Sequence, residues 1–376
     1  MPDHRAGVAA IVRPSSVTLG PGGLRRTPPR PAELRDPGYL DRYDDSTVFF
    51  DVFAAAGRTL AVGPPLLDLA APLSSARATV GGRAVRVRST ELDRVQRSDL
   101  GRAAGSDLEL TFAGERYRVP VGADLAGLFA GRRALMTLSL DNELAWLRDW
   151  ARYHASAHGA DAVVVYDNGS RSYGLDELLA TLASVPGIEI AVVVDWSFPY
   201  GPQGGPGVPW DSDYAQYGAL EHARRRLLRE AAGFLNADVD ELVLTADGSS
   251  VFEHAARAPH GVVSYTGRWV HPDPHTQGAG LPRHADSAWV DESEAVCSSK
   301  WCVVPARLTE RAQLQVHDVR GAKVYTPPGL GYRHFRAVST HWKEDRRAAV
   351  DDAGRLSVDA PLRAALDRHL PGSTTT

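Results

Sequence analysis

The stretch ALMTLSLDNELAWLRDWARYHASAHGADAVVVYDNGS, residues 134–170, predicts a strand, a helix and a second strand in succession. It opens on an apolar run that is long enough for a buried strand. Trp146, Trp150 and Tyr153 then recur at spacings of four and three, which places them on one face of a helix. Residues 163–166 are three valines and a tyrosine, a composition typical of a strand that is covered on both faces.

The same alternation continues along the chain to residue 236. We expect helices at 175–183 and 214–232, and strands at 188–194 and 233–236. Strands that alternate with helices indicate a mostly parallel α/β sheet flanked by helices. Because ligands bind at the carboxyl ends of the strands in such sheets, we expect the functional site in the loops that follow the strands.

Three further regions flank this α/β domain, which we place at residues 134–345. Residues 46–133 contain short apolar runs separated by turn signals, which predicts a small antiparallel β domain. Residues 1–45 are rich in Pro, Gly and Arg and lack periodicity, so we expect a flexible arm. For residues 346–376 we expect a C-terminal helix and a disordered tail.

The composition is that of a globular protein and limits the classes of partner. The chain has 376 residues and a formal net charge of −4, which argues against a broad attraction to nucleic acid or anionic lipid. No apolar stretch approaches the roughly 20 residues that span a bilayer, so we expect a cytoplasmic protein without a transmembrane segment. Cys297 and Cys302 lack a matching pair for a zinc site and are expected to be buried thiols.

Acidic and amide side chains follow four of the expected strands. They are Asp141, Asn142 and Glu143 after the first strand, Asp167 and Asn168 after the second, Asp195 after the third, and Asp238, Asp240 and Glu241 after the fourth. Asp238 and Asp240 are one residue apart, so in an extended backbone their side chains point the same way. Carboxylates are the ligands that hard divalent cations prefer, and a cation there would neutralise a diphosphate leaving group. A solvated turn with three acids is the ordinary alternative.

Several segments around these residues resemble motifs of the family 92 and family 2-like glycosyltransferases. Residues 141–154 are similar to the opening NE…L.EW..YH of that family, and residues 166–170 are similar to its YDN.S segment. Gln216, a basic helix and residues 236–241 follow in the order of the family block Q…R…DvDEF. Leu242 stands where the family usually has Phe.

The resemblance continues toward the C-terminus. Residues 299–305 resemble the KsivrP element, and His317 and residues 334–336 resemble the later vH and HYR elements. In all, the resemblance covers about residues 134–345. It implies a GT-A fold and transfer of a sugar from a UDP- or GDP-sugar to a hydroxyl acceptor, which would be a glycan, a lipid-linked molecule or a small molecule. It also implies Mn²⁺ or Mg²⁺ as the cofactor.

The same resemblance implies roles for individual residues. Asp238 and Asp240 would bridge the metal ion to the diphosphate. His317 is our first choice for a further metal ligand, and His334 is the second. The residues expected to bind the nucleotide sugar are Asn142, Glu143, Asp167 (near the nucleoside), Asn168, Asp195 and Lys300 (near the diphosphate).

The catalytic base is the remaining role. An inverting transferase needs a carboxylate that takes the proton of the acceptor hydroxyl. The candidates between the acidic triplet Asp238-Val239-Asp240 and Lys300 are Asp286, Asp291, Glu292 and Glu294. We favour Asp291 and Glu292 because the apolar run before them is expected to end at the cleft; a retaining mechanism stays open.

Some of these residue patterns also have ordinary structural explanations. Asn142 is a common helix-capping residue type, and the sequence that begins at Asp167 is a common turn sequence. His154 and His158 have the i,i+4 spacing that can bind zinc, but no glutamate lies between them in the zinc-protease arrangement. We therefore expect these two histidines to pack in the fold or face solvent.

Two other functions compete with sugar transfer. A nucleotidyltransferase also uses an α/β sheet and paired acids, but it would normally have a glycine-rich basic loop after the first strand. Residues 141–143 are Asp, Asn and Glu instead, which disfavours that function. A non-catalytic carbohydrate-binding scaffold with a degenerate transferase fold is the third possibility, and the intact acidic triplet argues against it.

Overall fold

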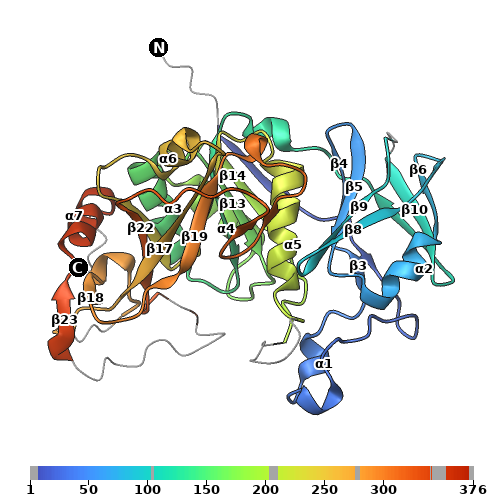
Figure 1. Cartoon of the computed structure of the whole chain (residues 1–376), viewed down its shortest axis with the longest axis horizontal. Coiled ribbons are helices and arrows are strands. Elements are labelled where there is room, and N and C mark those ends of the chain that lie inside the picture. Colours follow the sequence, from blue (N-terminus) through green and yellow to red (C-terminus); the bar gives the residue numbers. More distant parts are fainter. Residues whose placement is uncertain are drawn as a thin grey trace.

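The computed structural model describes residues 7–102, 106–202, 211–275, 280–338, 340 and 353–371. Within these residues nine strands form one large sheet, here called the main sheet, and smaller antiparallel sheets lie beside it (Figure 1). The strands of the main sheet are, in chain order, β1 (Val8–Val12), β12 (Arg133–Ser139), β13 (Ala162–Asp167), β14 (Ile190–Asp195), β15 (Gly233–Asn236), β16 (Glu241–Thr245), β17 (Val262–Val270), β19 (Cys297–Val303) and β22 (Leu330–Phe335).

The order across the main sheet is β1-β14-β13-β12-β15-β19-β17-β22-β16. The first five strands in that order run parallel to one another, as does the pair β17 and β22. Strand β19 runs antiparallel to both β15 and β17, and β16 runs antiparallel to β22. The predicted α/β class with a mostly parallel sheet is therefore confirmed. The carboxyl ends of β12, β13, β14 and β15 lie at the same edge of this sheet.

Each face of the main sheet packs against helices, because side chains along a strand alternate between its faces. In β13, Val163 and Val165 join a core with α3, α4, α6 and α7, whereas Val164 and Tyr166 join a second core with α5. The helix α4 has the predicted bounds, whereas α5 ends at His222 and a π-helical turn follows at Ala223–Leu227. These helices are α3 (Leu144–His158), α4 (Leu175–Ala183), α5 (Tyr214–His222), α6 (Val251–Arg257) and α7 (Ala360–His369).

The region predicted as a small β domain contains antiparallel sheets, as expected. In the described residues two sheets have four strands each, in the orders β4-β5-β9-β8 and β11-β10-β6-β7. Every strand pair in them is antiparallel. Their strands are β4 (Asp51–Ala55), β5 (Arg58–Gly63), β6 (Arg77–Val80), β7 (Arg83–Val85), β8 (Arg88–Leu92), β9 (Val95–Asp99), β10 (Asp107–Phe112) and β11 (Glu115–Pro120).

The expected flexible arm at residues 1–45 is wrong for the part that the structure describes, which begins at residue 7. Strand β1 adds to the edge of the main sheet beside β14, and β2 (Val17–Thr18) pairs with β3 (Thr47–Phe49). The buried guanidinium of Arg26 donates to the carbonyls of Pro65 and Thr47, both at 2.5 Å. Arg30 forms a buried ion pair with Asp211 at 2.6 Å. These partners lie far along the chain, so the local sequence gave no sign of the order.

A buried polar network joins the small sheets to the main sheet. The carboxylate of Asp51 on β4 accepts hydrogen bonds from His222 Nε2 at 2.8 Å and from Arg226 Nη1 at 2.6 Å. On the other side of the imidazole, the hydroxyl of Tyr166 on β13 donates to His222 Nδ1 at 2.7 Å. Burial lowers the pKa of His222, so the ring is neutral, with Nε2 donating to Asp51 and Nδ1 accepting from Tyr166.

The helix α3 covers the edge of the main sheet at β16. His158 Nε2 donates to the carbonyl of Val243 at 2.8 Å, and the Val243 N–H points at His154 Nε2 at 3.5 Å. Both histidines are buried, which confirms the expected packing role. Their ring nitrogens also provide partners for the backbone carbonyl and N–H of Val243 on an edge strand. Burial lowers the pKa of His154 to about 3 and that of His158 to about 4.

The C-terminal helix predicted after residue 345 corresponds to α7, and its Leu362 and Leu366 are buried in the core that includes α3. The boundary at 345 and the expected tail at 372–376 lie outside the described residues. None of the helices in the described ranges is long and apolar enough to cross a membrane. The remaining short elements are α1 (Tyr39–Arg42), α2 (Ala70–Ser74), β18 (Trp289–Asp291), β20 (Gln313–Leu314), β21 (Val319–Arg320) and β23 (Leu356–Val358).

Candidate functional site

Polar side chains align at the carboxyl edge of the parallel strands. Ser139, Asp167 and Asp195 are register partners at the ends of β12, β13 and β14. Strand β15 lies on the other side of β12, with Met136 paired to Asn236, and leads directly into the acidic triplet. The strand-end positions that the sequence singled out are therefore neighbours in the sheet.

Asp167 offers a buried acceptor atom at this edge. Its Oδ2 accepts the backbone N–H groups of Gly169 at 3.2 Å and Ser170 at 3.0 Å, which closes the loop after β13. Its Oδ1 is buried and has no hydrogen-bond partner among the described residues. A buried acceptor without a partner is costly, so this oxygen is suited to a donor group on a ligand.

The other residues expected at the nucleotide sugar mainly shape the loops around Asp167. Asn142 Nδ2 donates to Ser139 Oγ at 3.0 Å, and Asn168 Nδ2 donates to the carbonyls of Trp196 and Phe198, both at 2.8 Å. Glu143 is exposed at the start of α3 and makes no side-chain cap of that helix. Asp195 accepts a hydrogen bond from Ser197 Oγ at 3.0 Å. A direct role of these four residues in binding stays a prediction.

The acidic triplet forms a turn between β15 and β16, not the extended segment we had considered. Glu241 N–H donates to the Asp238 carbonyl at 3.0 Å, and Glu241 Oε2 accepts the Asp238 N–H at 2.9 Å. The next two carbonyls are also held. His284 Nε2 donates to the Val239 carbonyl at 2.9 Å, and the backbone N–H of Phe335 donates to the Asp240 carbonyl at 2.8 Å. As a result, Asp238 and Asp240 have different side-chain partners.

Asp238 pairs with Lys300, which lies on β19. Lys300 Nζ is 2.6 Å from Asp238 Oδ2 and 3.1 Å from Glu241 Oε2, and the lysine side chain is only 1% exposed. Burial alone would lower the pKa of Lys300, but the two carboxylates raise it above its ordinary value. Burial likewise would raise the pKa of Asp238, and the ammonium holds it below its usual range. For Glu241, burial raises the pKa against the opposing effect of Lys300.

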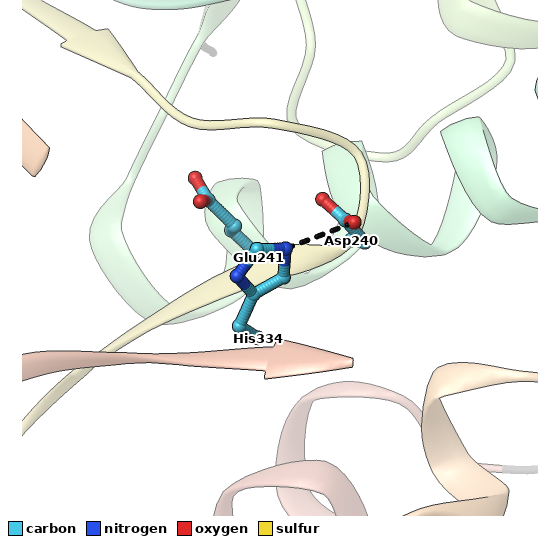
Figure 2. A group of neighbouring side chains, drawn as sticks. All are labelled: Asp240, Glu241 and His334. Carbon is cyan, nitrogen blue, oxygen red and sulfur yellow. Dashed lines mark hydrogen bonds and ion pairs between the residues drawn. The ribbon is translucent and has the colours of Figure 1, made fainter. Parts of the chain in front are cut away.

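Asp240, Glu241 and His334 form a group that could hold a metal ion (Figure 2). One ligand atom from each lies within 4.8 Å of the others, and His334 Nε2 is 3.0 Å from Asp240 Oδ2. The antiparallel register of β16 and β22 places Glu241 opposite His334. Burial would lower the pKa of His334, but the Asp240 carboxylate raises it to about 10. Two carboxylates and an imidazole match the ligands of Mn²⁺ and related divalent ions.

An aromatic stack fixes the imidazole of this group, here called the metal-binding group. The indole of Trp269 on β17 is stacked on His334, with ring centroids 4.2 Å apart and planes within 18°. The guanidinium of Arg336 lies 4.4 Å from the centroid of the same indole. These stacking contacts restrict the orientation of the imidazole.

The sequence favoured His317 over His334, and the structure brings a different set together. His317 is exposed, its Nδ1 lies 3.1 Å from the Ser299 carbonyl, and it is outside the metal-binding group. Glu241 had no assigned role, although it directly follows the triplet. That adjacency was the one available signal for Glu241. The ligand roles of Asp238 and His317 stay predictions.

The candidate bases at residues 291–294 have hydrogen-bond partners outside the metal-binding group. Asp291 ends β18 and its Oδ1 accepts the N–H and hydroxyl of Ser293, at 2.8 and 2.6 Å. Glu292 is exposed and both its carboxylate oxygens accept from Arg268 Nη1, at 2.8 and 2.7 Å. Glu294 accepts from His271 Nε2 at 2.9 Å. No described contact connects Asp291 or Glu292 to the metal-binding group, so their catalytic role stays a prediction.

Comparisons with protein-family models and with curated proteins found no match to this chain.

Proposed function

We propose that this protein is a metal-dependent glycosyltransferase with a GT-A-like fold, which moves a sugar from a UDP- or GDP-sugar to a hydroxyl acceptor. The observation that carries the proposal is the pairing of two features at one edge of the main sheet. One is the metal-binding group of Asp240, Glu241 and His334, and the other is the buried, unpartnered oxygen of Asp167. The ordered sequence motifs support the same function.

The residues at this edge have complementary tasks in the proposed reaction. Asp240, Glu241 and His334 would hold Mn²⁺ or Mg²⁺, which when bound would supply positive charge for the diphosphate leaving group. Asp167 Oδ1 would accept a hydrogen bond from the nucleoside, and Asn168 keeps the neighbouring loop in place through its two carbonyl contacts. Each of these roles is therefore assigned to a side chain of this protein.

Proton removal from the acceptor is assigned to a carboxylate of the segment 291–292. Asp291 and Glu292 are both accessible to solvent, so either can meet an acceptor hydroxyl that enters from outside. The acceptor class includes glycans, lipid-linked molecules and small hydroxyl compounds. Replacing each carboxylate by its amide and measuring the rate of sugar transfer separates the two candidates.

The proposal is tested by nucleotide binding with and without metal. We expect UDP or GDP with Mn²⁺ to raise the melting temperature of the wild type, because a ligand bound only by the folded state stabilises it. Asp240→Asn is expected to weaken Mn²⁺-dependent binding about 100-fold, since it removes one charged ligand. Asp176→Asn, an exposed residue of α4, is the matched control and should bind like the wild type.

The contrary results are equally specific. If Asp240→Asn binds UDP and GDP in the presence of Mn²⁺ as tightly as the wild type does, the metal assignment is wrong. Absence of any nucleotide binding, with retained binding of glycans, would favour a carbohydrate-binding scaffold over a transferase. Calorimetry with UDP and GDP measures nucleotide binding. A glycan array probed with the same preparation measures glycan binding.

A further inference from the structure

Lys300 brings a buried positive charge to the acidic turn. Its ammonium is within 3.1 Å of two carboxylates, those of Asp238 and Glu241, and its side chain is almost fully buried. It is therefore enclosed behind the turn and presents little surface to a donor molecule. This placement differs from the expected approach of Lys300 to a diphosphate.

Glu241 belongs to two arrangements at once. Its Oε2 is the ion-pair partner of Lys300, and its carboxylate is also part of the metal-binding group with Asp240 and His334. A divalent cation in that group would be separated from the ammonium by a single carboxylate. Two like charges that share one buried carboxylate repel each other strongly, because the protein interior screens charge less than water does.

We infer that Lys300 is a built-in counter-cation that weakens the affinity of the metal-binding group for a divalent cation. The inference rests on the proposed function, since it concerns the same metal site. The ammonium pairs with Asp238 and competes for Glu241, whereas Asp240 lies 3.0 Å from His334. Lys300 is accordingly a positioning residue, which keeps the carboxylates together while no metal is bound.

The predicted consequence is a gain of metal affinity when the charge is removed. We expect Lys300→Met, which keeps the length of the side chain, to bind Mn²⁺ about tenfold more tightly than the wild type without nucleotide. We also expect the variant to melt at a lower temperature without metal, and Mn²⁺ to raise its melting temperature by more than that of the wild type. The free Mn²⁺ signal in electron paramagnetic resonance gives the affinity directly.

Three further variants separate charge from other effects. Lys300→Gln can still donate a hydrogen bond to Asp238 but carries no charge, so it should also bind Mn²⁺ more tightly and serves if the Met variant does not fold. Lys300→Arg keeps the charge and should remain close to the wild type. Lys323→Met removes an exposed lysine and should leave Mn²⁺ affinity unchanged.

Weaker or equal Mn²⁺ binding by a folded Lys300→Met or Lys300→Gln variant, beside a wild type that binds, would overturn the inference alone. Mn²⁺ binding by neither the wild type nor any Lys300 variant, with or without UDP and GDP, would remove the proposed metal site as well. The two failures are distinguished by the wild-type titration.

Discussion

Two of the clusters in the described part of the chain, around Asp51 and at the acidic turn, contain acid, histidine and a basic residue in different proportions. In the first, Asp51 is enclosed by His222 and Arg226, and the carboxylate and imidazole are both 0% exposed. One acid faces one permanent cation. Burial would raise the pKa of Asp51, but the hydrogen bond from His222 and the charge of Arg226 hold it below its ordinary value.

The second cluster contains more acid than base. Asp238 and Glu241 pair with the ammonium of Lys300 and Asp240 pairs with His334, and the side chains of Asp238 and Asp240 are 34% and 16% exposed. Removing one partner of a sealed ion pair leaves an uncompensated buried charge, whereas perturbed acids that reach solvent are candidates for a ligand site. The Asp51 cluster connects the small sheets to the main sheet, whereas the acidic turn keeps two carboxylates partly accessible to solvent.

The largest expected effect is a loss of unfolding free energy when the buried Asp51 cluster is broken. Asp51→Asn leaves Arg226 buried without its carboxylate, and removal of one partner of a buried ion pair costs about 3–5 kcal/mol of unfolding free energy. Urea denaturation measures this loss, with Asp176→Asn as the exposed control. A loss of less than about 1 kcal/mol would contradict the structural role of the network.

An effect of intermediate size concerns the pH dependence of stability that arises from the buried histidines of α3. His158 titrates near pH 4 in the folded protein because burial lowers its pKa, but near pH 6.5 when the chain is unfolded. The unfolded state therefore binds more protons between these values, and stability falls as the pH drops below about 6.5. We expect His158 to account for about 1–2 kcal/mol of stability lost between pH 7 and pH 5.

The variant His158→Gln isolates this contribution. Its amide can still donate to the Val243 carbonyl but does not titrate, so its unfolding free energy should depend less steeply on pH than that of the wild type. Identical pH slopes for the two proteins would show that His158 is not protonated on unfolding. Urea denaturation at several pH values between 5 and 7 gives both slopes.

The smallest expected effect lies in an ion pair outside both clusters. Glu292 and Arg268 form a solvent-exposed pair, and such pairs contribute about 0–1 kcal/mol. Glu292→Gln should therefore change the melting temperature very little, whatever its effect on catalysis. A marked loss of stability would mean that exposure is a poor guide to the weight of an ion pair in this protein.

Much of the sheet could be predicted from the sequence because its signals are local. The β-branched run of β13, the helix α4 and the acids after each strand follow from spacing along the chain. The edge strand β1 could not be predicted, since its partner begins at Ile190 and its own apolar run is short. The structure of residues 7–45 likewise depends on partners that are remote in sequence.

The site was predictable only in part for a similar reason. Asp240 is named by its motif, but its histidine is 94 residues away, and antiparallel register between β16 and β22 leaves no pattern in the sequence. Motif order alone could not rank His334 above His317. The motif singled out Lys300 for a contact with the diphosphate, and its burial against Asp238 becomes visible only in three dimensions.

The most direct test of the central claim, that a cation binds at Asp240, Glu241 and His334, is pulsed electron paramagnetic resonance of bound Mn²⁺. We expect a nitrogen coupling from a coordinated imidazole in the wild type. His334→Gln should abolish this coupling, and His317→Gln should leave it in place. Persistence of the coupling in His334→Gln, or its loss in His317→Gln, would contradict the assignment and place the metal ion elsewhere on the turn.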